Sequence, residues 1–234
     1  MDSNSTIGAL KVDKRLPELQ FNTLLSFLSP EKQQKIKRFF RWQDQHLGLF
    51  GDLLSRQMIM ESTGCKNHEI RFETEKYGKP ILLGFNNLHF NISHSGEWVV
   101  CAMGSSEIGV DVELIDDIDL SISESFFHSV EHKDIIGASD SIDRFFDYWT
   151  MKESYIKYFG KGLSQKLNSF CIKVKEFPIS EIELEGKSVK GVELVQYDFE
   201  SGYKVAACGH VDTLPSEIDL RSIQDLSNQF LGLM

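Results

Sequence analysis

A chain of 234 residues can bury a sizeable core, either as one domain or as two closely packed halves. Its formal charge of −10 argues against a general nucleic-acid binder, because polynucleotide phosphates are bound by basic surfaces. The N-terminus lacks the regions of a signal peptide, no apolar run could cross a membrane, and the four cysteines lack CxxC spacing. We therefore expect a cytoplasmic protein with no membrane or nucleic-acid partner.

Two helices are predicted early in the chain. Before them, a weak apolar pattern over residues 7–21 indicates a first strand. Ser29 and Pro30 have the residue types of a helix cap and first turn, and the helix that they open is expected to end near residues 40–42. A second helix is expected over about residues 44–60, where leucines recur on one face.

The first of these helices carries a basic cluster in an otherwise acidic chain. Its members are Lys32, Lys35, Lys37, Arg38 and Arg41. Such a cluster can receive phosphates or an acidic partner. The alternative is the solvated face of a helix, which the cluster alone does not exclude.

A tight turn follows a short strand expected at residues 70–72. The turn consists of Tyr77, Gly78, Lys79 and Pro80. Gly and Pro can hold the lysine on a rigid loop and leave its backbone open to a ligand. A plain connecting turn with a solvated lysine is the alternative, and the turn alone favours it.

Residues 88–103 are predicted to form a β-hairpin. Apolar and polar residues alternate up to Ser93, His94 and Ser95, and a mostly apolar strand returns after Gly96. His94 at the strand end could satisfy the backbone of the turn, or it could donate a hydrogen bond to a phosphate.

The stretch 108–114 predicts a strand with two distinct faces. Apolar side chains occupy one face, while Gly109, Asp111 and Glu113 share the other. Two neighbouring carboxylates repel unless a cation lies between them, and Mg²⁺ prefers such oxygen ligands together with water and substrate phosphate. Gly109 would leave room beside the acids. An amphipathic edge strand with solvated acids is the alternative.

A helix is expected over residues 145–163, capped by Asp140 or Ser141 and ended by Gly160 and Gly162. Its apolar stripe consists of Phe145, Trp149, Ile156 and Phe159. Glu153 and Lys157 lie one turn apart on a neighbouring face, a spacing that by itself is most often a solvated pair.

The remaining elements complete a mixed chain. A helix is expected over residues 123–136 and another near 221–234, with strands over residues 169–174, 181–184, 191–197 and 203–211. GEWVVCAMGS at 96–105 is echoed by GYKVAACGHV at 202–211, which favours two related halves. We predict an α+β pseudo-dimer with halves 1–105 and 106–234, each a small, mainly antiparallel sheet packed with helices, and a site between them.

Four motifs together resemble one family. YGKP, NISHS, GVDVE and WTMKESYIK occur in this order, and the ordered set resembles the 4′-phosphopantetheinyl transferases of the large, surfactin-synthetase-activating type. The resemblance covers nearly the whole chain. It implies a monomer that transfers the phosphopantetheine arm of coenzyme A to a serine of an apo acyl or peptidyl carrier protein, with Mg²⁺ as cofactor. It also implies service to peptide or polyketide synthases, and so to antibiotic biosynthesis.

The resemblance implies roles for the acids and one lysine. Asp111, Glu113 and Glu153 match the metal ligands of the family. Glu153 is also a candidate base for the incoming serine, and Lys157 matches a lysine that contacts the reacting phosphate. A metal and cations would neutralise the phosphates, and a base would activate the hydroxyl.

The resemblance also implies a coenzyme A site. Its expected members are Ser93 and His94 at the phosphates, Tyr77, Gly78, Lys79 and Pro80 beside the adenine and ribose, and Lys32 and Lys35 near the 3′-phosphate. His46 is a further candidate contact. The family often has an arginine and a hydroxyl residue after this histidine, whereas this chain has Leu47 and Gly48, so two phosphate contacts are expected to be absent.

Two other functions remain open at this point. One is a non-catalytic relative that docks carrier proteins or binds coenzyme A, although the presence of all three acids and Lys157 counts against it. The other is a different Mg²⁺-dependent phosphohydrolase or nuclease, and the missing basic stripe disfavours a polynucleotide substrate.

Overall fold

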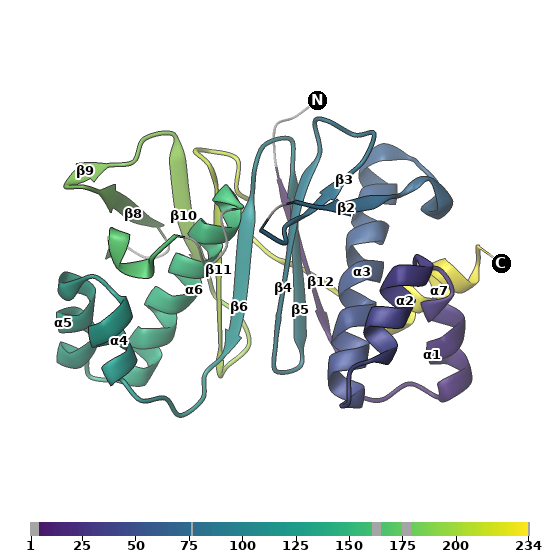
Figure 1. Ribbon diagram of the computed structural model, residues 1–234, viewed down its shortest axis with the longest axis horizontal. Helices are drawn as coiled ribbons and strands as arrows, with labels where there is room; N and C mark the ends of the chain where they lie inside the picture. The colour runs from purple at the N-terminus through teal and green to yellow at the C-terminus, as the bar shows by residue number, and fades with distance from the viewer. Residues whose placement is uncertain (1–4, 76, 161–164, 175–178, 234) are drawn as a thin grey trace.

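The structure is a computed structural model that describes residues 5–75, 77–160, 165–174 and 179–233. Strands of two sheets meet in the middle of the molecule, with a group of helices on each side (Figure 1). The sheets are mainly antiparallel, so the α+β class expected from the sequence is confirmed. No helix in these ranges is both long and apolar enough to span a membrane.

The first layer combines both ends of the chain. In chain order it contains β1 (Thr6–Lys11), α1 (Glu18–Leu25), α2 (Pro30–Lys37), α3 (Trp42–Thr63), β4 (His89–Ser95), β5 (Trp98–Gly104), β12 (Asp219–Arg221) and α7 (Ile223–Leu231). The strand order is β12-β1-β5-β4, and β12 pairs with β1 in parallel. The hairpin expected over residues 88–103 is confirmed as β4 and β5.

The second layer holds the later elements. They are β6 (Gly109–Leu114), α4 (Ser121–Phe126), α5 (Ser129–Gly137), α6 (Ser141–Phe159), β7 (Phe170–Val174), β8 (Ile179–Leu184), β9 (Lys187–Ser188), β10 (Val192–Tyr197) and β11 (Tyr203–His210). The strand order is β6-β11-β10-β8-β7, with β9 beside β8. A separate hairpin consists of β2 (Phe72–Thr74) and β3 (Pro80–Leu82). The division into halves 1–105 and 106–234 stays a prediction, and β12 and α7 lie with the first layer (Figure 1).

Strand alternation divides the apolar residues among three cores. On β5, Val99, Cys101 and Met103 join the core under α3, whereas Trp98, Val100 and Ala102 join a core between the two sheets. The third core lies between the second sheet and α6. The sheets are therefore buried on both faces, and the edges β4 and β6 meet at the junction of the layers.

Helix α6 begins and ends where the sequence signals indicate. The Asp140 side chain accepts a hydrogen bond from the backbone N–H of Asp143 at 2.9 Å, and Gly160 has the left-handed φ of +64° that ends the helix. Gly162 lies outside the described residues. Phe145 and Ile156 are buried, but Phe159 is 41% exposed, so the apolar stripe is shorter than expected.

Several expected boundaries of secondary structure are wrong. The helix α2 ends at Lys37 and not near residues 40–42, and the strand expected at 70–72 is β2 (Phe72–Thr74). Residues 18–21 belong to α1, not to a first strand, which ends at Lys11. The single helix expected over 123–136 is two helices, because Phe127 is extended and the His128 side chain caps α5 by accepting from the N–H of Val130. Glu131 completes this cap by accepting from the backbone N–H of His128 at 2.8 Å.

Candidate active site

The two layers are joined by side chains where β4 meets β6. These strands belong to different sheets, and hydroxyls of β4 reach carboxylates of β6. Ser93 Oγ donates to Asp111 Oδ1 at 2.8 Å, and Ser95 Oγ donates to Glu113 Oε2 at 2.8 Å. The alternation of both strands thus brings two motifs predicted from the sequence into direct contact.

Gly109 allows α6 to lie directly on β6. A Cβ at this position would be 2.1 Å from the carbonyl oxygen of Ser154 and 2.4 Å from the backbone nitrogen of Tyr158. The sequence interpretation gave Gly109 a different role, which was to leave room beside the carboxylates. That interpretation is wrong, because the helix backbone fills the space and brings Lys157 against Asp111.

Asp111 and Lys157 form the centre of the site. Lys157 Nζ donates to Asp111 Oδ1 at 2.6 Å and to Ser93 Oγ at 2.8 Å. Asp111 is 2% exposed, and its Oδ2 is a buried atom without a hydrogen-bond partner among the described residues. Burial raises the pKa of the Asp111 carboxyl, and the nearby Lys157 and Ser93 offset part of the rise.

Glu113 is held at both oxygens. Ser95 binds Oε2, and the indole N–H of Trp149 donates to Oε1 at 3.2 Å. Burial raises the pKa of Glu113, and the Asp111 carboxylate raises it further. Ser95 and Trp149 were missed as functional residues, although Ser95 is two positions after Ser93 and therefore faces the same way.

Glu153 is half-buried on α6, one turn before Lys157. Burial raises the pKa of Glu153, and the Asp111 carboxylate raises it further. The positive charge of Lys157 offsets only part of this rise. Lys157 therefore favours the ionised form of Glu153, while burial and the Asp111 carboxylate oppose it. As the described side chains stand, no three His, Cys, Asp or Glu residues converge closely enough to form a metal cluster.

His94 lies at the edge of the site, and its side chain reaches solvent. Surrounding protein atoms desolvate the ring and lower its pKa, and the positive charge of Lys157 lowers it further. Lys32 and Asp44 also act on this histidine through their charges. The basic helix α2 and the start of α3 therefore lie beside the same site.

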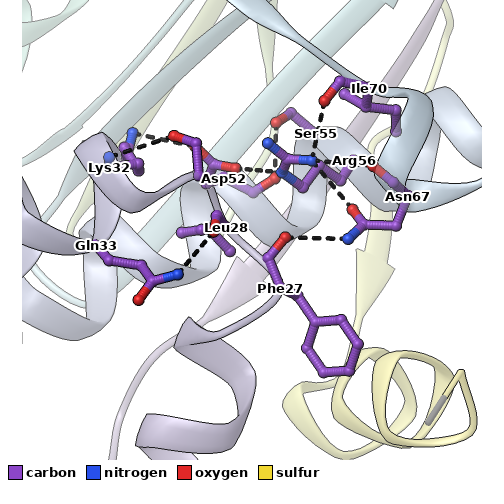
Figure 2. Close-up of polar contacts among 10 residues, drawn as sticks. Phe27, Leu28, Lys32, Gln33, Asp52, Ser55, Arg56, Asn67 and Ile70 are labelled. Carbon is purple, nitrogen blue, oxygen red and sulfur yellow. Dashed lines mark hydrogen bonds and ion pairs between the residues drawn. The ribbon is translucent and has the colours of Figure 1, made fainter.

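Figure 2 shows Lys32 paired with Asp52, which is in turn bonded to Arg56. Lys32 Nζ lies 3.4 Å from Asp52 Oδ2, and Asp52 Oδ1 accepts from Arg56 Nε at 2.5 Å. Arg56 Nη1 in turn donates to Asn67 Oδ1 at 3.1 Å. Asp52 and Arg56 are buried on α3, so the carboxylate that pairs with Lys32 is fixed in place. Lys35, which lies on α2 with Lys32, is exposed.

The turn at 77–80 is tied to the second layer through its lysine. Lys79 Nζ lies 2.5 Å from Glu107 Oε2 and donates to the carbonyl of Tyr158 at 3.2 Å. Gly78 has a φ of +93°, as expected for a tight turn, and Tyr77 is 51% exposed. The Lys79 ammonium group is therefore already paired, while the ring of Pro80 is partly exposed.

His46 contributes to packing. It is 2% exposed, its Nε2 accepts from the backbone N–H of Leu16 at 3.0 Å, and its Nδ1 lies 2.8 Å from the carbonyl of Trp42. Its ring also stacks on Phe21, with centroids 4.8 Å apart. Both nitrogens are used inside the protein, so we correct the expected coenzyme contact at His46.

Comparison with known proteins bears on these motifs. A family model for "4'-phosphopantetheinyl transferase, N-terminal" matches residues 17–106, and one for "4'-phosphopantetheinyl transferase superfamily" matches residues 107–208. The chain is 37% identical to 4'-phosphopantetheinyl transferase Sfp of Bacillus subtilis (strain 168), over 94% of this chain and 99% of that protein. The chain belongs to the 4'-phosphopantetheinyl transferase superfamily. The resemblance carried by the four motifs is thus confirmed.

Other members and solved structures differ in how much of their sequence they share with this 4'-phosphopantetheinyl transferase superfamily member. It is 35% identical to 4'-phosphopantetheinyl transferase gsp of Aneurinibacillus migulanus, over 95% of this chain and 93% of that protein. The solved Thermotoga maritima holo-[acyl-carrier-protein] synthase has a TM-score of 0.37 and 13% identity, over 44% of this chain and 61% of its own, which is too low to define a shared fold. The contact around Asp111 unites both matched regions, because Ser93 comes from the first and Lys157 from the second.

Proposed function

We propose that this chain transfers the 4′-phosphopantetheine arm of coenzyme A to a serine hydroxyl of an apo carrier protein and releases adenosine 3′,5′-bisphosphate. Membership of the superfamily supports this reaction. The observation that carries the proposal is the contact among Ser93, Asp111 and Lys157, which joins a lysine ammonium and a buried carboxylate at the junction of the two layers.

The residues suit an attack on a pyrophosphate. The serine oxygen of the carrier forms a bond to the pantetheine-bearing phosphorus, and the bond from that phosphorus to the bridging oxygen breaks. Glu153, half-buried on α6 one turn before Lys157, would take the serine proton as the general base. Lys157 and His94 would face the phosphates, and Lys32 would lie near the 3′-phosphate.

Asp111, Glu113 and Glu153 would hold Mg²⁺. The fit rests on the unpartnered, buried Asp111 Oδ2, and on the mutual repulsion by which Asp111 raises the pKa of both glutamates. Bound there, the ion would neutralise charge on the pyrophosphate oxygens. Ser95 and Trp149 would keep Glu113 oriented toward the ion.

Mass spectrometry tests the transfer directly. An apo carrier protein incubated with the chain, coenzyme A and Mg²⁺ should gain one phosphopantetheine unit. The Asp111→Ala variant should lose this activity while its circular dichroism stays that of the wild type, because the site lies at the junction of layers and outside the three apolar cores. The proposal fails if the folded wild type leaves unmodified a carrier that the Sfp relative converts. Coenzyme A cleavage without a carrier would favour a phosphohydrolase instead.

The carriers that we propose are domains of peptide or polyketide synthases, which would link the chain to antibiotic biosynthesis. The large type of the family supports this, and we further propose that the chain works as a cytoplasmic monomer. Conversion of a peptidyl carrier in preference to a fatty-acid carrier, at equal concentrations, would support the assignment. An equal rate with both would contradict it.

A further inference from the structure

We propose that the chain has a second small-molecule site, a pocket between the two sheets that takes a neutral, mainly apolar molecule with a carbonyl or ether oxygen. The pocket has a volume of about 770 Å³, within the range of sites for drug-sized ligands. Its walls come from both layers, with Lys11, Trp98 and Leu220 on one side and Val195, Tyr197 and Phe199 on the other.

The pocket is separate from the site around Asp111. On β6, Val110 and Val112 face the core between the sheets, and the alternation of the strand turns Asp111 and Glu113 to the opposite face. The pocket lies where this core ends, and its lining includes none of the residues to which we assign a role in transfer. A ligand there would therefore leave the transfer site unoccupied.

The indole of Trp98 supplies the polar contact. Trp98 is 6% exposed, and its Nε1 is buried without a hydrogen-bond partner in the part of the chain that the structure describes. Phe199 packs against this ring with centroids 4.6 Å apart, so the proposal includes rotation of that half-buried side chain to admit a ligand. An unsatisfied buried donor calls for an acceptor, which a ligand oxygen would provide.

The other polar groups favour a neutral ligand. Lys11 already lies 2.5 Å from Glu200, and the Tyr197 hydroxyl donates to the carbonyl of Pro215 at 2.9 Å. Asp198 and Glu217 add exposed negative charge to the lining. The rim therefore repels anions, including coenzyme A, and the apolar side chains of Val195 and Phe199 favour a hydrocarbon body.

Fluorescence titration with the neutral naphthalene ketone Prodan tests the site. Prodan should bind the wild type saturably at one site per chain, with blue-shifted emission. Leu220 lines the pocket and is 65% exposed, so the larger side chain of Leu220→Trp should block the opening. This variant should weaken binding by at least about tenfold. Leu19→Trp is the matched control, since Leu19 is 81% exposed on α1, away from the pocket, and should change affinity by less than about twofold. Val195→Phe provides a second filling variant if Leu220→Trp does not fold.

A second comparison tests Trp98 itself. Trp98→Phe should weaken Prodan by about 2- to 12-fold, the equivalent of one neutral hydrogen bond, and should weaken a Prodan analogue lacking the ketone oxygen by less than about twofold. Equal weakening of both probes would overturn the role of Trp98. No saturable binding to the wild type, unchanged binding to the filled variants, or displacement of Prodan by coenzyme A would overturn the site.

Discussion

The buried carboxylate of Asp111 is unfavourable for folding but suited to binding a cation. Burying a carboxylate is unfavourable, and here Ser93 and Lys157 compensate Oδ1, while Oδ2 has no partner among the described residues. Asp111 also raises the pKa of Glu113 and Glu153, so its carboxylate repels both glutamates beside one ammonium group. Such an arrangement is stabilised by added positive charge, which Mg²⁺ and the cations of the site would supply.

Glu153→Gln separates the role of a base from that of a metal ligand. The substitution keeps the shape and one oxygen but removes the charge and the basicity. If Glu153 is the base, kcat should stay about 10²- to 10⁴-fold low at saturating Mg²⁺. Rates at increasing Mg²⁺, with chemistry shown to be rate-limiting, provide the measurement. Recovery to within a few-fold of wild type would mean that Glu153 is only a ligand.

The raised pKa of Glu153 also predicts how stability depends on pH without metal. The folded chain binds this proton more tightly than the unfolded chain, so the free energy of unfolding falls as pH rises from the ordinary value of 4.5 through the raised value. The Glu153→Gln variant does not undergo this loss. Its free energy of unfolding, relative to that of the wild type, should therefore increase as pH rises through this range. Urea unfolding at about pH 4 and about pH 7 measures the change. A difference between variant and wild type that is the same at both pH values would contradict the shift.

At the scale of elements, the site depends on how closely α6 approaches β6. The carbonyl of Ser154 and the backbone of Tyr158 occupy the place of a side chain at Gly109. This contact sets the position of Lys157 against Asp111, while Gly160 ends the helix beside the side chain of Lys79. A small shift of α6 would therefore alter both the charge pair and the attachment of the turn at 77–80.

Gly109→Ala should be strongly destabilising. Its Cβ would clash with backbone atoms that cannot rotate away, so a loss of about 3 kcal/mol or more in unfolding free energy is expected, together with loss of transfer. Gly137→Ala is the matched control, because nothing lies within 4 Å of a Cβ there. Chemical denaturation of both variants checks the prediction. Wild-type stability of Gly109→Ala would show that the helix is free to move outward.

At the scale of the whole molecule, charge and apolar exposure bear on carrier docking. The chain has a net charge of −10, and carriers are commonly acidic, so long-range attraction should be weak and apolar contact more important. The sequence of residues 120–127 predicts an apolar docking contact that includes Ile122 and Phe126, with ordinary core as the alternative. The structure divides this segment, since Ile122 packs against the third core, between the second sheet and α6, whereas Phe126 is 56% exposed on α4.

Phe126→Ser should raise the KM for the carrier by about fivefold or more, while the KM for coenzyme A stays the same, because an exposed aromatic side chain contributes to docking and not to the core. Leu19→Ser is the control, with an exposed apolar residue on the opposite layer. Steady-state kinetics with each substrate varied in turn gives the two constants. An unchanged KM for the carrier would remove Phe126 from the docking surface.

The amino-acid sequence determined most of the elements and indicated Asp111, Glu113 and Lys157 as central residues of the candidate site. Ser29 and Asp140 identified the starts of α2 and α6, and the alternation in residues 108–114 identified β6 with its two acids. These signals are local, because caps, turns and strand alternation depend on residues a few positions apart. The motif order also indicated the family before any geometry was known.

Only the tertiary structure decided which partners these residues have. His46 binds Leu16, thirty positions away, and therefore differs from its expected role, while Lys79 binds Glu107 across the layers. Trp149 reaches Glu113 from another element, and no short-range pattern shows this. Gly109 is the clearest example: its sequence context indicates only a small residue on a strand, and the helix backbone packed above it explains why the residue is small. Long-range packing fixes such contacts, and local propensity does not encode them.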